Sequence, residues 1–166
     1  MRRIVLILIV LAAALVPVGA YAAKRAIGDG TLLLHDVDGK VVIAGRGAII
    51  GRVGRGIVTI RDRTPNDESD PAVWGARDFR QSDDGLYVYR GQNIRFRLIG
   101  GAFRVTIDGR GIDVSVVGNG VASVDADRGL YSTNGVDCQL SPASCTTIAP
   151  GRQLIPITAP RVARQP

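Results

Sequence analysis

The stretch VVIAGRGAIIGRVGRGIV (41–58) decides the fold, because a second stretch of the chain repeats its pattern. Residues 105–122 read VTIDGRGIDVSVVGNGVA, and eight of the eighteen positions are identical at a constant offset of 64. The shared residues include a GRG motif and a VGxG motif. An ungapped match of this length predicts an internal duplication, with repeat units over 41–62 and 105–126.

The glycines of this stretch are typical of strand punctuation and not of a phosphate-binding loop. Such a loop needs a helix directly after it, because the N-terminal amides of that helix bind the anion. Gly51 is instead followed by RVGRGIVTI, which adds two glycines and a β-branched run. The second copy has Ser115 at the position of Gly51. We therefore expect turns at the GRG and VGxG glycines and no nucleotide site.

The periodicity of the remaining chain is that of strands. In NIRFRLIGGAFRVTI (93–107), apolar residues alternate with polar ones on both sides of Gly100–Gly101, which predicts a hairpin with a tight turn. The alternation continues from Ile112 to Val116, and no segment after residue 22 has a sustained helical period. We predict one all-β domain over 23–133, an antiparallel β-sandwich or barrel of about nine to ten short strands. A short β-solenoid is the alternative.

The first 22 residues are typical of a secretory signal peptide. Two arginines precede the apolar run 4–16, and Ala20-Tyr21-Ala22 supplies a small-x-small cleavage pattern. If this segment stayed uncleaved, residues 4–23 would anchor the protein in a membrane. We expect a secreted or cell-envelope protein of bacterial origin that meets a membrane only in the uncleaved case.

The two cysteines of the chain, Cys138 and Cys145, are expected to form a disulfide. An even, close pair in an exported chain favours a disulfide, and the chain's single histidine disfavours a metal site. Residues 134–166 are then predicted to comprise a disulfide loop and a mobile tail rich in proline and arginine.

A polar segment, 63–82, follows the first repeat unit and has no counterpart of its length after the second. It predicts a long surface loop, in which Trp74, the only tryptophan, is a candidate apolar anchor for a ligand. Its clustered acids suggest a calcium site at Asp67, Glu68 and Asp70, although their spacing does not match an EF-hand. The alternatives are a solvated acidic loop and an exported hydrolase that uses these carboxylates.

Arginine is the most prominent charged residue of the chain, whose formal net charge is +6. Alternation places three arginines on a solvent face, and two more lie where the second copy has valine and asparagine. A positive sheet face fits a polyanion such as a wall polymer or an anionic lipid. The alternative is an ordinary charged face that pairs with aspartates. The candidate arginines are Arg95, Arg97 and Arg104 on the solvent face, with Arg52 and Arg55.

The sequence favours a protein without catalytic activity or a cofactor. His35 is the only imidazole, and it is expected to be a structural residue at a strand edge. No GxSxG elbow is present, so a serine nucleophile lacks its usual setting. Aromatic residues are too sparse to favour nucleic acid. We expect a structural or binding role, with an anionic envelope polymer or another envelope protein as partner.

Overall fold

The computed structural model describes residues 29–64, 70–82 and 85–159, so the predicted signal peptide lies outside the described residues. Within them, one antiparallel sheet contains five strands and does not close on itself. The prediction of an all-β, antiparallel protein is confirmed, but two strands are 33 and 47 residues long, which corrects the expected series of short ones. The elements are β1 (Gly30–Asp62), β2 (Ala72–Ser82), β3 (Leu86–Ser132), the 3-10 turn η1 (Pro142–Ser144), β4 (Thr146–Thr147) and β5 (Gly151–Ile157).

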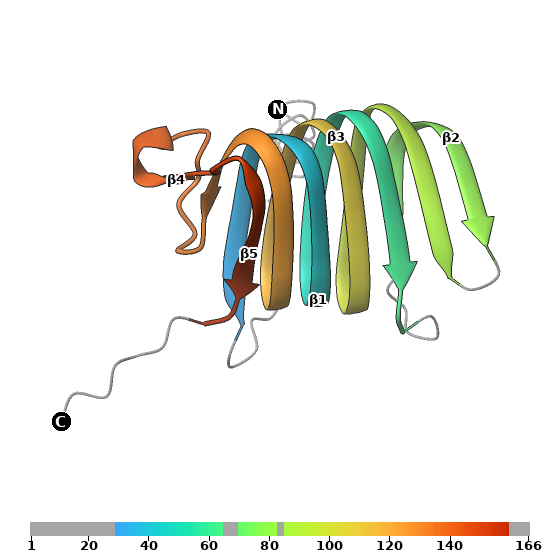
Figure 1. The fold of residues 1–166 in the computed structure, drawn as a ribbon. Coiled ribbons are helices and arrows are strands. Elements are labelled where there is room, and N and C mark those ends of the chain that lie inside the picture. Colours follow the sequence, from blue (N-terminus) through green and yellow to red (C-terminus); the bar gives the residue numbers. More distant parts are fainter. Residues whose placement is uncertain (1–28, 65–69, 83–84, 160–166) are drawn as a thin grey trace, which may run out of the picture.

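The two long strands, β1 and β3, run antiparallel and wind together as a two-stranded ribbon (Figure 1). Many residues of β1 have a partner in β3 on each side. Lys40, for example, lies opposite both Asp108 and Asp125, which are 17 residues apart. In the later part of β1 the spacing is 18 residues, as between Arg95 and Asp113, the two partners of Arg52. Each strand therefore advances by one turn of a coil about every 17 to 18 residues, and the turns stack side by side.

The coil is flattened into two layers with one apolar core between them (Figure 1). The layer named the back layer here contains β5 and faces the viewer in Figure 1, and the front layer lies behind it. Alternate side chains point into this core, as the sequence predicts. Phe96 is 1% exposed, whereas Arg95 and Arg97 on either side of it are exposed. The front layer comprises residues 31–36, 48–53, 94–99 and 112–117. The back layer comprises residues 40–44, 57–61, 86–90, 103–108 and 121–125.

Glycines form the corners where the ribbon passes from one layer to the other. Gly47 lies opposite Gly118, and Gly45 lies opposite Gly120, so that two backbones approach each other without side chains between them. A Cβ atom on Gly118 would lie 2.0 Å from the carbonyl oxygen of Arg46. These glycines therefore bend continuous strands and do not separate short ones.

The GRG motif of each repeat unit contacts the VGxG motif of the other. Gly45 of the first GRG is opposite Gly120 of the second VGxG, and Gly56 of the first VGxG is opposite Gly109 of the second GRG. The segments between the motifs differ, however, because corresponding residues point to opposite faces of the sheet. Ile50 is 54% exposed, whereas its sequence counterpart Val114 is buried. The two units thus share their corners and differ in the front layer.

Gly100–Gly101 does not form the predicted hairpin. Ile99 and Ala102, on its two sides, pair with Ala48 and Arg46 of β1 and not with each other. The glycine pair lies at the same corner as Gly47, and both of its residues have positive φ. Positive φ at two successive glycines suits a hairpin turn as well as this corner of the ribbon. The identity of the facing strand distinguishes the two structures here.

Two segments expected outside the sheet belong to it. The predicted loop 63–82 is wrong over Ala72–Ser82, because this segment is strand β2, an edge strand that pairs with β3. The predicted mobile tail is wrong over Gly151–Ile157, because β5 pairs with β3 and buries Ile155 and Ile157. Residues 65–69, 83–84 and 160–166 lie outside the described residues.

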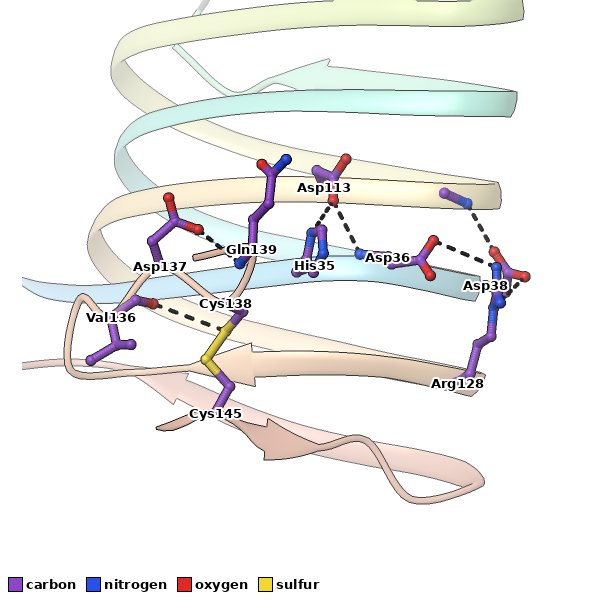
Figure 2. A network of polar contacts seen from close by, with 11 residues as sticks. His35, Asp36, Asp38, Asp113, Arg128, Val136, Asp137, Cys138, Gln139 and Cys145 are labelled. Atoms are coloured by element: carbon purple, nitrogen blue, oxygen red, sulfur yellow. Dashed lines mark hydrogen bonds and ion pairs between the residues drawn. A yellow bond between two sulfur atoms is a disulfide. The ribbon is translucent and has the colours of Figure 1, made fainter. Parts of the chain in front are cut away.

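The aspartate Asp38 fastens the corner at Gly111 (Figure 2). One carboxylate oxygen accepts a hydrogen bond from the Gly111 amide at 2.8 Å, and the other accepts one from Arg128 Nε at 2.8 Å. Burial by itself raises the pKa of Asp38. The Gly111 hydrogen bond and the Arg128 guanidinium outweigh it, so the pKa lies below its ordinary value of 3.8.

We expect Asp38→Asn to lower the free energy of unfolding at neutral pH by about 1 kcal/mol. Because the folded-state pKa is depressed, the ionised carboxylate stabilises the fold above the unfolded-state pKa. That stabilisation is lost as pH falls through the folded-state pKa. Urea unfolding of wild type and variant between neutral pH and about pH 3 should therefore show a shrinking difference. A difference that stays constant with pH would contradict this account. Asp36→Asn is the control, because the Asp36 carboxylate lies 3.5 Å from Arg128, and it should lower the free energy of unfolding by less than Asp38→Asn does.

Candidate anion-binding groove

A groove of about 830 Å³ crosses the front layer. Its floor is formed where buried residues of neighbouring strands lie side by side. Gly51 is essential to this floor, because a Cβ atom there would lie 2.2 Å from the ring of Phe96. The residues that line the groove include Leu33, His35, Ile50, Arg52, Trp74, Arg95, Arg97, Asp113, Ser115, Asp137 and Gln139.

One row of side chains spans the groove from strand to strand. Trp74 of β2 lies opposite Arg95 of β3, which lies opposite Arg52 of β1, which in turn lies opposite Asp113 of β3. His35, in the first turn of β1, then hydrogen-bonds to Asp113. Neighbouring strands are about 4.8 Å apart, so the four steps of this row extend about 19 Å.

Three arginines dominate one half of the groove. Arg52, Arg95 and Arg97 are exposed, and among the residues that the structure describes none of them forms an ion pair. Arg52 lies directly opposite Arg95, an arrangement of like charges that destabilises a sheet. The carboxylate of Asp113, on the other side of Arg52, accepts hydrogen bonds from His35 and from the Asp36 amide.

The back layer arranges its charges differently. Lys40 lies between Asp108 and Asp125, and Asp125 lies opposite Arg152 of β5. Opposite charges face each other at these positions, whereas Arg61 lies opposite Arg104 with like charge. In the front layer Arg52 has both kinds of neighbour, since it lies between Arg95 and Asp113.

His35 and Asp113 form a polar pair at the other end of the groove (Figure 2). His35 Nδ1 lies 2.8 Å from a carboxylate oxygen of Asp113, which also accepts the Asp36 amide at 3.0 Å. His35 does not lie in an edge strand: it pairs with Leu130, and its neighbour Leu34 pairs with β3 on both sides, at Val114 and Tyr131. No local sequence pattern predicts the pair, since the two residues are 78 positions apart.

The disulfide loop forms the wall beside this polar pair. The bond between Cys138 and Cys145 is confirmed, and Cys138 is buried. The Asp137 carboxylate accepts a hydrogen bond from the backbone amide of Gln139 at 2.9 Å, which orders the part of the loop that lines the groove (Figure 2). The cross-link therefore holds polar side chains over the front layer.

Four of the six predicted ligand residues meet in the groove, namely Trp74, Arg52, Arg95 and Arg97. The other two lie apart. Arg55 lines a separate hollow at a corner, with Arg77 and Arg90. Arg104 lies in the back layer, opposite Ala44 and Arg61.

The calcium candidates are only partly described. Asp67 and Glu68 lie outside the described residues, and Asp70 is exposed. Within the described ranges, no group of three or more His, Cys, Asp or Glu residues could hold a metal ion.

No family model, curated protein or solved structure matches this chain. Over the part of the chain that the structure describes, no helix has the length and apolar character needed to cross a membrane.

Proposed function

We propose that this chain is an exported, non-catalytic β protein of the cell envelope that binds an anionic polymer in the front-layer groove. The observation that carries the proposal is the cluster of Arg52, Arg95 and Arg97, three guanidinium groups that form no ion pair among the described residues, although Arg52 has Asp113 as its cross-strand neighbour. The signal-peptide pattern and the disulfide support export, since disulfides persist in oxidising compartments.

An anion is the ligand that the arginine cluster fits best. Each guanidinium offers a planar fork of donors to a carboxylate or phosphate, and a bound anion relieves the repulsion between Arg52 and Arg95. The groove is open and about 19 Å long from Trp74 to His35, which exceeds the reach of one small anion. A polymer that crosses several strands uses this length.

Calorimetric titration of the wild-type protein at low ionic strength tests the proposal. Hyaluronan, poly-L-glutamate and polyphosphate serve as anionic polymers, and dextran serves as the neutral control. We expect at least one anionic polymer to bind, with an affinity that falls as salt is added. Dextran, which carries no charge, should not bind. Failure of all three polymers to bind, or binding that salt does not weaken, would remove the proposal.

We infer that the two repeat units arose by duplication and then diverged in the front layer.

A hydrolase using the carboxylates of 63–82 is the alternative function. Asp70→Asn tests it better than deletion of the segment, because deletion would remove β2. The mass of the native N-terminus distinguishes a secreted protein from one anchored by residues 4–23.

A further inference from the structure

We propose that the anionic polymer is an acidic polysaccharide in which carboxylate-bearing sugars alternate with neutral ones. This inference rests on the proposed function and adds the chemical class of the ligand. It follows from what lies beside the arginines: an exposed indole at one end of the groove and a set of hydroxyl-binding groups at the other.

Trp74 provides a flat apolar surface next to the arginine cluster. It is 55% exposed and lies opposite Arg95, so an acidic group bound by Arg95 would bring its carrier against the indole. The indole is a large flat apolar surface with one polar N–H group, and its face suits the apolar face of a ring. A peptide-like polyanion such as poly-L-glutamate has no ring to place there.

The polar end of the groove suits hydroxyl groups better than further negative charges. Ser115, Gln139 and the carboxylates of Asp113 and Asp137 line it, and together they offer donors and acceptors. The two carboxylates repel a polymer with a charge on every unit, such as polyphosphate or a nucleic acid. A polysaccharide whose acids are separated by neutral sugars places hydroxyls at these positions.

An anionic lipid fits the groove less well. Its acyl chains need an enclosed apolar cavity, whereas this groove is open and carries the exposed side chains of Arg52, Arg95 and Arg97. The proposed ligand is therefore a polysaccharide, and vesicles that contain anionic lipid are the competing ligand in the test.

Because Trp74 is the only tryptophan of the chain, its fluorescence reports on this site alone. We expect hyaluronan oligosaccharides to change its emission and to bind at least about tenfold more tightly than poly-L-glutamate, a difference of about 1.4 kcal/mol. Measured by calorimetry, Trp74→Ala should lose at least about tenfold in affinity for hyaluronan, and Trp74→Phe should lose less. Leu154→Ala, which removes another exposed apolar side chain, is the control and should bind as wild type does.

The outcomes separate this inference from the function on which it rests. Equal binding of poly-L-glutamate, without a change in emission, would overturn the polysaccharide and leave the anion-binding groove in place. Tighter binding to vesicles containing anionic lipid than to hyaluronan would also overturn it. Binding of no anionic polymer would remove both proposals.

Discussion

Replacing Gly118 by valine is expected to abolish the folded state. The new Cβ atom would lie 2.0 Å from the Arg46 oxygen and 3.0 Å from the Gly47 Cα atom, both of which belong to the backbone. No flexible side chain can move to make room, and the strain falls on a corner that joins the two layers. We expect a loss of at least about 4 kcal/mol, which approaches the total stability of a small domain. Circular dichroism and urea unfolding measure the loss.

The repeat supplies a matched control for this prediction. Gly54 is the counterpart of Gly118 in the first unit, yet a Cβ atom there would meet its nearest neighbour, the Arg110 oxygen, only at 3.1 Å. Alanine at both positions makes the comparison matched: Gly54→Ala should cost about 1 kcal/mol or less, whereas Gly118→Ala should cost clearly more, because its Cβ atom would overlap the Arg46 oxygen. If Gly118→Val unfolded with a urea midpoint like that of wild type, the corner geometry described above would be wrong.

The second large effect is expected in binding. Replacing Arg52, Arg95 and Arg97 together by glutamine should lower the affinity for hyaluronan by at least about a hundredfold, because three charge-assisted contacts are lost at once. All three side chains are exposed, so the free energy of unfolding should stay within about 0.5 kcal/mol of wild type or rise as repulsion is relieved.

Arg104→Gln is the single-charge control for the groove variant. Arg104 is also an exposed strand arginine with the same alternation in sequence, but it lies in the back layer. It should bind hyaluronan almost as wild type does. A loss in Arg104→Gln about one third as large, on a logarithmic scale, as that of the triple variant would indicate attraction by net charge alone and would contradict a groove-specific site.

The sequence predicts what depends on neighbours along the chain. The direction of Phe96, Arg95 and Arg97 follows from alternation, because side chains on a strand point to opposite faces in turn. The disulfide follows from spacing and compartment, and the glycines are correctly identified as sites of special backbone geometry.

The features that the sequence missed depend on distant partners. Gly100–Gly101 has the pattern of a hairpin, and only pairing with β1 turns it into a corner. Residues 72–82 alternate too weakly to predict β2, because an edge strand at the end of the coil has few buried positions. The contact of His35 with Asp113 exists only because the ribbon winds, so no local pattern could reveal it.

The groove is predicted in part by local sequence and in part depends on distant partners. Alternation predicts that Arg95 and Arg97 lie on one face, and Arg52 is a candidate because the second stretch has Val116 in its place. The register of β1 and β3 then brings Arg52 opposite Arg95. Trp74 joins them through β2, although it was expected on a loop.

The salt dependence of hyaluronan binding tests the central claim most directly. The logarithm of the binding constant, plotted against the logarithm of the salt concentration, should fall steeply for wild type and for Arg104→Gln. For the variant with glutamine at positions 52, 95 and 97, the slope should be clearly shallower, because the charge contacts between the polymer and the groove are removed. The same slope in all three proteins would contradict an anion-binding groove built from these arginines.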